Sequence, residues 1–319
     1  IFSFLNDVYK KKIWSYTYAN NFEKEETDIL KKNLKKISIS KNKFRQKYIQ
    51  INYSKFLDSI VNPRSLDHPL VYEASYPINM VCRNAKKENV KVLMSGQGAD
   101  ELFFGYDRYQ YLLQKNKKGL KIDDIYYGHG LRNIKQIEKI TGMKKRKFEK
   151  NSYSYQWLMR SKLKKLKKLI IFDQKFRLQM LLKRDDLASM KNGVEMRVPF
   201  LDLKFLNWMN AVPDKFKYNF RYKKKILQEI LKEKININYK NYKKIGSLTD
   251  ARYWMKTKDF REKLTSLIEE KNSISRNFLN LNEIKKIMMV DKNERFFFIK
   301  WSLFNLETWR KKNFLQNKL

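Results

Sequence analysis

Cysteine and histidine are scarce in this sequence, with one cysteine and two histidines among 319 residues. One cysteine cannot form a disulfide within the chain, and Cys82 lies in an apolar stretch, as expected for a protein of the reducing cytoplasm. His68 precedes a proline and His129 lies between two glycines, so neither belongs to a cluster of ligand-like residues. We therefore expect a cytoplasmic protein without a zinc site.

Long apolar runs are missing as well. No run approaches the roughly 20 residues that a membrane helix needs, and no charged-then-apolar leader opens the chain. The Walker pattern GxxxxGK[ST] does not occur, which excludes the P-loop kinases and ATPases. What the chain has instead is 42% hydrophobic residues, enough to fill the core of one large domain or two ordinary ones.

Acidic residues are outnumbered by 71 Lys and Arg to 33 Asp and Glu, which gives a net charge of +38. Such an excess attracts polyanions, including nucleic acids and anionic membranes. However, Lys far outnumbers Arg, and Lys, Asn and Ile, which share A/T-rich codons, are over-used together. A recognisable nucleic-acid module is also missing. We expect no specific nucleic-acid partner, although the most basic segment, Lys144–Ile171, is open to either a solvated or a membrane- or polyanion-binding interpretation.

The first third of the chain alternates strand-like and helix-like stretches. We predict strands at Ile13–Ala19, Lys47–Tyr53 and Val90–Met94. Helical stretches are predicted at Ile1–Tyr9, Glu25–Lys36, Lys55–Val61 and Pro69–Lys87. This alternation favours a doubly wound parallel sheet covered by helices on both faces.

After about Leu102 the strand signal fades and amphipathic helices dominate. Apolar residues recur at helical spacing in Phe172–Leu182, Leu203–Ala211, Lys223–Lys234 and Phe296–Arg310. We therefore predict an α/β part over residues 1–116 and a mostly helical part over residues 117–319.

The strongest local signal is the segment Val90–Tyr106, VKVLMSGQGADELFFGY. A strand ends at Ser95, Gly96 and Gly98 bracket a tight loop, and Asp100 and Glu101 open the next helix. In open α/β sheets ligands bind at the carboxyl ends of the strands, and glycines with a helix N-terminus suit a phosphate. An aspartate there is a suitable ligand for Mg²⁺. The same pattern also fits a plain strand-to-helix turn that Asp100 caps.

A second polar segment, LKRDDLASMKNGVEMRVPFLD, spans Leu182–Asp202. Its carboxylates and arginine can pair and order a loop, although a salt-bridged helix end at the surface is an equally simple interpretation. The residues concerned are Asp185, Asp186, Glu195, Arg197 and Asp202.

Together the two segments match a family pattern that runs S-G-x-G-x-D-E-x-F-x-G-Y, then D-x-x-S-M, then E-x-R-x-P-F-L-D. The chain resembles the C-terminal synthetase domain of glutamine-hydrolysing asparagine synthase, from Ile13–Ala19 to about Trp254. Every position of the pattern is filled, by Ser95, Gly96, Gly98, Asp100, Glu101, Phe103, Gly105 and Tyr106; by Asp186, Ser189 and Met190; and by Glu195, Arg197, Pro199, Phe200, Leu201 and Asp202.

The resemblance implies a fold of the adenine-nucleotide α-hydrolase type and an ATP-dependent carbon–nitrogen ligase. In this family a carboxylate, in the first place aspartate, attacks the α-phosphate of ATP, pyrophosphate leaves, and ammonia displaces AMP from the acyl-adenylate. The ammonia comes from glutamine through an N-terminal glutaminase domain in the same chain. ATP and Mg²⁺ are the expected cofactors, and a homodimer is one option for the assembly.

The resemblance also implies roles for individual residues. Ser95, Gly96, Gly98, Asp100 and Glu101 would bind ATP and pyrophosphate, with Asp100 as the metal ligand. Gln97 and Lys244 would be catalytic, where Lys244 belongs to YKKIG, the nearest match to the family's R-x-K-x-G. A last set would line or order the site: Asp186, Ser189, Glu195, Arg197 and Asp202.

Three departures from the family pattern affect the interpretation. The family's S-G-G-x-D-S loop and its glutaminase domain do not precede Ile1, so we expect an N-terminally truncated fragment that is inactive alone. Gln97 stands where many asparagine synthases have Glu, and a glutamine cannot act as a general base. The alternatives are therefore an amidotransferase for another carboxylate, or an inactive basic remnant that binds polyanions.

Overall fold

The computed structural model describes residues 13–19, 28, 44–50, 52–54, 56, 69, 75–109, 125, 134–163, 165–217, 223–235, 251–290 and 296–314. These residues fall into two compact units that interleave along the sequence. The first unit comprises residues 1–51, 77–119 and 164–247, and the second comprises residues 52–76, 120–163 and 248–319. The division predicted near residue 116 stays a prediction.

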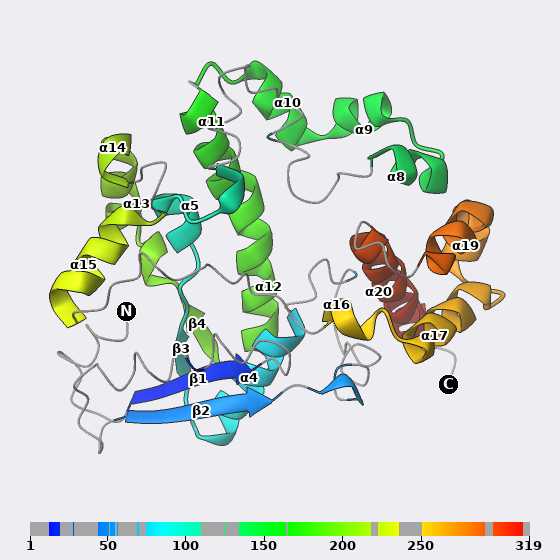
Figure 1. Ribbon diagram of the computed structural model, residues 1–319, viewed down its shortest axis with the longest axis horizontal. Helices are drawn as coiled ribbons and strands as arrows, with labels where there is room; N and C mark the ends of the chain where they lie inside the picture. Colours follow the sequence, from blue (N-terminus) through cyan, green and yellow to red (C-terminus); the bar gives the residue numbers. More distant parts are fainter. Residues whose placement is uncertain are drawn as a thin grey trace. The chain divides into compact units, whose positions relative to one another are not determined.

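The strands of the first unit form two small parallel sheets within the described part of the chain. β1 (Ile13–Ala19) pairs with β2 (Phe44–Gln50) over their whole length, as Figure 1 shows in blue. β1 confirms the predicted strand, whereas β2 begins three residues before its predicted start. Lys47 of β2 donates to Glu88 at 2.7 Å, which ties the strand to the end of α4 (Ser75–Lys87).

The second sheet joins the two sequence motifs. β3 (Val92–Met94) is parallel to β4 (Glu195–Arg197), with Val92 opposite Glu195. The pairing continues beyond the strands, because the Ser95 N–H donates to the Arg197 carbonyl at 2.8 Å. β3 confirms the predicted strand at Val90–Met94, two residues shorter. β4 lies in the second polar segment, for which the sequence predicts a loop or a helix end, and its strand character comes from pairing with a partner about 100 residues away.

Helices make up the rest of the first unit. α11 (Lys165–Phe172), the π-helical turn η2 (Asp173–Arg177) and α12 (Leu178–Met190) follow one another without a break (Figure 1). The predicted helix at Phe172–Leu182 is therefore confirmed, as a part of this longer run. The remaining elements are α5 (Ala99–Phe103), the 3₁₀ turn η3 (Pro199–Leu201), α13 (Leu203–Ala211), α14 (Asp214–Lys217) and α15 (Lys225–Ile235).

α5 is held in place by an apolar cluster. Ala99, Leu102 and Phe103 are buried with Met209 of α13, and the partly buried Phe200 packs against them. The Phe103 and Phe200 rings meet edge to face, with centroids 5.7 Å apart. Both aromatic residues belong to the motifs recognised in the sequence, so part of each motif is core and supports the loop before α5.

The second unit is helical in its described residues. It contains α8 (Ile134–Thr141), α9 (Lys145–Asn151), α10 (Tyr153–Arg160), α16 (Ala251–Trp254), α17 (Lys258–Glu269), α18 (Ile274–Phe278), α19 (Leu281–Met289) and α20 (Phe297–Phe314). Its core is aromatic: Phe56 lies 4.6 Å from Trp254 and 5.8 Å from Trp301, and Phe260 lies 4.9 Å from Phe304, between ring centroids. α20 confirms the helix predicted at Phe296–Arg310 and continues to Phe314.

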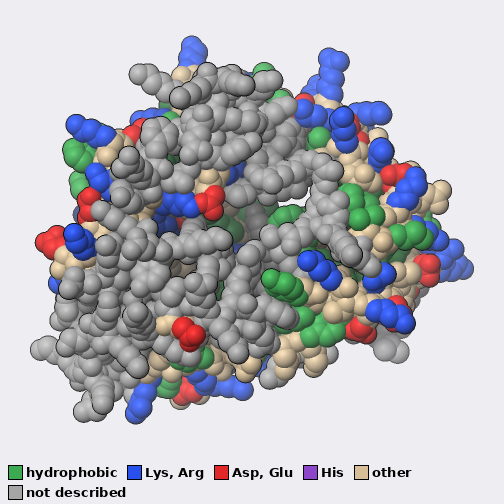
Figure 2. Space-filling model, viewed as in Figure 1, with side chains coloured by type: hydrophobic (Ala, Val, Ile, Leu, Met, Phe, Trp, Pro, Cys, Tyr) green, Lys and Arg blue, Asp and Glu red, His purple; other side chains and the backbone are tan. Residues whose placement is uncertain are grey.

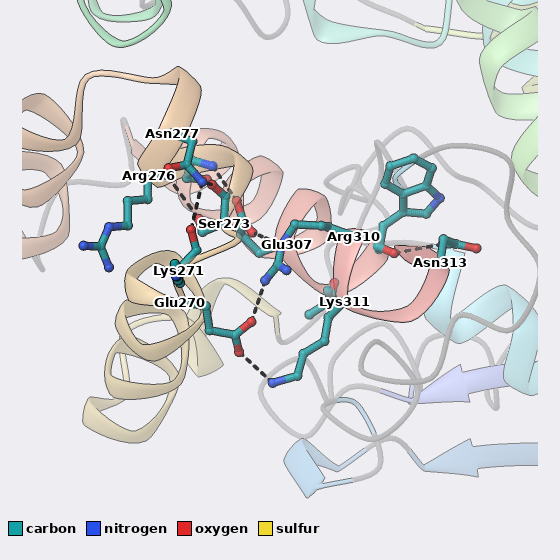
Figure 3. A network of polar contacts seen from close by, with 12 residues as sticks. Glu270, Lys271, Ser273, Arg276, Asn277, Glu307, Arg310, Lys311 and Asn313 are labelled. Carbon is teal, nitrogen blue, oxygen red and sulfur yellow. Dashed lines mark hydrogen bonds and ion pairs between the residues drawn. The ribbon is translucent and has the colours of Figure 1, made fainter. Parts of the chain in front are cut away.

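A buried polar network joins α20 to the end of α17 and the start of α18 (Figure 3). Arg310 donates to Glu307 at 2.7 Å and to Glu270 at 2.6 Å. The second oxygen of Glu307 accepts the Ser275 N–H at 2.6 Å. Glu307 thus accepts a hydrogen bond from one backbone N–H at the N-terminus of α18, where a negative charge is favoured.

The structure confirms an α/β chain that is mostly helical, with parallel strand pairing near its start. The helix predicted at Ile1–Tyr9 lies outside the described residues, as do those at Glu25–Lys36 and Lys55–Val61 apart from the helical Asp28 and Phe56. Among the helices that are described, none is both long enough and apolar enough to cross a membrane. Cys82 is fully buried, and burial raises the pKa of its thiol to about 12.

Candidate active site

The loop after β3 leaves its backbone open to a ligand at one glycine and closes against the core at the other. A Cβ on Gly96 would meet no atom within 4 Å, whereas one on Gly98 would collide with the Leu201 side chain. Gly98 also has φ +88°, a conformation that side chains disfavour. The Gln97 N–H bonds the Ser95 hydroxyl at 3.3 Å, so the sharp turn is held locally.

Asp100 stands in the first turn of α5 beside a lysine from a distant segment. The Lys224 Nζ lies 3.0 Å from Asp100 Oδ1, and both side chains are partly exposed. The Lys224 N–H also donates to the Phe103 carbonyl at 2.9 Å, which anchors the residue to the end of α5. The pair therefore presents a carboxylate and an ammonium together, one helical turn from the glycine loop.

Lys224 is a residue that sequence reasoning missed. It belongs to a run of three lysines, residues 223–225, and nothing in that run distinguishes it from a solvated surface charge. The lysine that we did single out, Lys244, lies outside the described residues. Only the tertiary contact with Asp100 identifies Lys224 as part of the site.

Gly105 makes room for this ion pair. A Cβ at this position would run into both the Asp100 carboxylate and the Lys224 Cε. We expect Gly105→Ala to separate the pair while keeping both charges, and so to weaken binding of magnesium pyrophosphate at least about tenfold. Isothermal titration calorimetry measures this, with Gly142→Ala as a control for backbone strain away from the site, because Gly142 has φ +68° but a Cβ on it would meet nothing within 4 Å. Equal affinities of the Gly105→Ala variant and the wild type would contradict this account of the glycine.

Glu101 is buried, unlike the adjacent Asp100. Its side chain is buried at 1% exposure and accepts a hydrogen bond from the Tyr106 hydroxyl at 2.6 Å. Burial raises the pKa of this carboxyl above its usual value, although the Tyr106 bond opposes the shift. The expected role of Glu101 in binding ATP and pyrophosphate stays a prediction; in the structure its carboxylate is buried and accepts a bond from a protein donor.

The second motif supplies an exposed ion pair and a helix cap. Arg197 donates twice to Glu195, at 2.8 and 3.1 Å, from the same face of β4, and more than half of each side chain is exposed. The hydrogen bonds from Arg197 lower the pKa of Glu195. Asp202 Oδ1 accepts the Phe205 N–H at 3.0 Å and thereby caps α13. The Arg197 carbonyl accepts the Ser95 N–H at the start of the glycine loop, whereas Glu195 is opposite Val92 at the other end of the strand pair and Asp202 caps α13.

The remaining motif residues lie near the end of α12. The Ser189 hydroxyl donates to the Asp186 carbonyl at 3.0 Å, and Ser189 is buried. The Asp186 side chain is exposed, while the adjacent Asp185 is buried and paired with Arg184 at 2.7 Å. These contacts order the helix end that leads into β4.

Asp100 also allows a test of whether the residues present fit a magnesium ion. No group of three or more His, Cys, Asp or Glu side chains suited to a metal occurs among the described residues. Mg²⁺ commonly takes only one or two protein carboxylates when it arrives with substrate phosphates, and Asp100 is a partly exposed oxygen donor. Among the described residues the site therefore offers one carboxylate to an ion that arrives with phosphates, and it forms no separate metal cage.

Comparison with known proteins identifies the fold family. The family model described as asparagine synthase matches residues 12–311. The chain belongs to the asparagine synthase family. All described site residues of both motifs lie inside the matched range, so the sequence resemblance to this family is confirmed.

Two curated proteins illustrate the relationship. The chain is 28% identical over 244 residues to asparagine synthetase [glutamine-hydrolyzing] 1 of Bacillus subtilis (strain 168), covering 64% of this chain and 37% of the relative. It is 27% identical over 141 residues to the putative asparagine synthetase [glutamine-hydrolyzing] 1 of Methanocaldococcus jannaschii, covering 44% and 18%. The chain thus spans well under half the length of either relative.

Proposed function

We propose that the chain is the synthetase part of an ATP-dependent amidotransferase that converts a carboxylate, in the first place aspartate, into its amide. The juxtaposition of β3 and β4 carries the proposal, since the glycine loop and Arg197 lie at the carboxyl edge of this parallel strand pair, next to α5 and the Asp100–Lys224 pair. Parallel α/β sheets bind their ligands at this edge. A doubly wound sheet of the adenine-nucleotide α-hydrolase type is the corresponding fold.

The proposed reaction has two steps. A carboxylate oxygen attacks the α-phosphorus of ATP, the bond from that phosphorus to the bridging oxygen breaks, and pyrophosphate leaves with the electron pair. Ammonia then attacks the acyl carbon, AMP leaves, and the nitrogen loses a proton to give the amide. We propose that the ammonia comes from glutamine, which is consistent with the names of both curated relatives.

The residues of the site meet the electrostatic demands of this chemistry. The Gly96 backbone is open to close approach, which suits the phosphate chain. Lys224 places a positive charge where charge develops on the phosphoryl oxygens, and Lys244 is proposed as a second lysine in that role. A Mg²⁺ ion held by Asp100 would neutralise the charge of the leaving pyrophosphate.

Pyrophosphate release by the purified full-length protein tests the proposed function. With ATP, Mg²⁺ and ammonia present, we expect release to depend on an added carboxylate and to yield equal amounts of AMP and amide. A panel of carboxylates, with aspartate first, identifies the substrate. Release of inorganic phosphate in place of pyrophosphate, or no dependence on any carboxylate, would contradict the proposal.

Gln97 bears on the identity of the carboxylate, because it lies in the loop and is neutral. If the substrate is aspartate, we expect Gln97→Glu to maintain or raise asparagine formation. If the pocket is adapted to a different carboxylate, the added negative charge should lower the rate with the true substrate, by about tenfold or more. Comparing kcat/KM of both proteins over the panel separates these cases. Gln179→Glu, at an exposed position of α12, is the matched control.

On the face in Figure 2, the described basic side chains do not single out a polyanion-binding surface. Among the described residues on the face in Figure 2, Lys and Arg side chains are dispersed between apolar and acidic ones and do not form one continuous stripe. Binding driven by such dispersed charge is expected to be indifferent to sequence and to weaken steeply as salt rises. Filter binding to unrelated DNA and RNA sequences at two salt concentrations distinguishes it from specific recognition.

A further inference from the structure

A buried charge cluster lies behind the site and contains residues outside the recognised motifs. Asp173 is fully buried and accepts a hydrogen bond from Arg108, which is also buried, at 2.6 Å. The Arg177 Nε lies 3.6 Å from the same carboxylate oxygen. Two arginines thus converge on one aspartate in the interior of the first unit, where an ion pair has to be complete because an unpaired charge is costly.

The cluster reaches the site through Tyr106. The Arg177 guanidinium lies over the Tyr106 ring, 6.0 Å from its centroid, and the Tyr106 hydroxyl donates to the buried Glu101. Glu101 directly follows Asp100 in α5. A chain of contacts therefore runs from Asp173 through Arg177 and Tyr106 to the helix that carries Asp100.

The backbone that carries Asp173 and Arg177 departs from a regular α-helix. Residues Asp173–Arg177 form a π-helical turn, and the Leu178 N–H donates to the Asp173 carbonyl five residues back. Such a turn inserts an extra residue into a helix and is frequent at functional sites. It occurs at the point where Asp173 and Arg177 face the segment from Tyr106 to Tyr109.

We infer that Asp173 and Arg177 are positioning residues that, through Tyr106 and Glu101, hold α5 so that Asp100 and Lys224 face the nucleotide phosphates. The inference rests on the proposed function for the identity of the ligand. It also gives Glu101 a role inside the protein, as the end of this chain of contacts, in place of a direct contact with pyrophosphate.

Two variants separate positioning from simple stability. Arg177→Met leaves the Arg108–Asp173 pair intact but removes the guanidinium that lies over the Tyr106 ring. Arg108→Met combined with Asp173→Leu removes both buried charges together, which proteins often tolerate, whereas breaking such a pair is strongly destabilising. We expect both variants to fold, with thermal unfolding close to that of the wild type. Glu233→Gln, which changes an exposed carboxylate of α15 in the same unit, is the control.

Calorimetric titration with magnesium ATP is the decisive measurement. We expect affinity to fall at least about tenfold in both variants, with the KM for the carboxylate unchanged in the turnover assay. Wild-type affinity in Arg177→Met, or a change in the carboxylate KM alone, would overturn the inference. If the double variant does not fold, Arg177→Met decides the question.

Failure of this inference can be distinguished from failure of the proposed function. If the wild-type protein binds no magnesium ATP, the proposed function fails, and amide hydrogen exchange over residues 99–106 then tests the positioning by itself. We expect faster exchange in this segment for both variants, and exchange at wild-type rates would refute the inference without any reference to a ligand.

Discussion

Asp100→Asn is expected to reduce the rate of pyrophosphate release by about a hundredfold or more. The substitution keeps the size and shape of the side chain but removes the carboxylate that we propose to hold the nucleotide-bound metal. It also leaves Lys224 without the charge that lies 3.0 Å from its Nζ. The leaving pyrophosphate then loses part of its charge neutralisation, and the lysine loses the partner that orients it.

The neighbouring ion pair provides a matched control. Asp107 pairs with Lys223, the residue before Lys224, but its side chain is 75% exposed. Asp107→Asn thus makes the same chemical change seven residues further along the chain, and we expect a rate within a few-fold of the wild type. Equal losses in the two variants would indicate a general effect of charge, and full activity in Asp100→Asn would remove the metal assignment.

Arg310→Met is expected to lower the free energy of unfolding of the second unit by roughly 3–5 kcal/mol. Arg310 and Glu307 are 4% and 0% exposed, so the substitution leaves Glu307 as a buried charge without its cationic partner. The Glu307 carboxylate still accepts the Ser275 N–H at 2.6 Å, which carries no compensating charge. Hydrogen exchange of the α18 and α20 amides in increasing urea measures the loss within this unit.

Lys311→Met is the control for this prediction. Lys311 binds the same Glu270 at 2.6 Å but is 54% exposed, so its removal should cost less than about 1 kcal/mol. Adding Glu307→Gln to Arg310→Met removes the stranded charge while keeping an acceptor for Ser275, and we expect part of the stability to return. A similar loss for Lys311→Met and Arg310→Met would show that burial does not set the strength of this network.

Some elements were predictable because their signals are local. The strand at Ile13–Ala19 and the helix at Leu203–Ala211 have the predicted bounds, since apolar spacing over seven to nine residues is enough to indicate them. The glycine loop was also predictable from a local signal, because a strand, two close glycines and an acidic helix start are consecutive in the chain. β4 was not predicted, since three residues carry no periodic signal and only the β3 backbone makes them a strand.

The sequence by itself determined the family, the location of the glycine loop and the identity of Asp100 as the carboxylate beside it. These depend on residues that are adjacent in the chain and on the order of two motifs. The tertiary structure alone decided which lysine lies beside Asp100, that Glu101 is buried under Tyr106, and that Asp173 joins two arginines behind the site. Each of these facts is a contact between segments far apart in the sequence or a matter of burial. In a chain with 71 lysines and arginines, composition cannot distinguish the few cations that folding brings to a carboxylate from the many that remain in water.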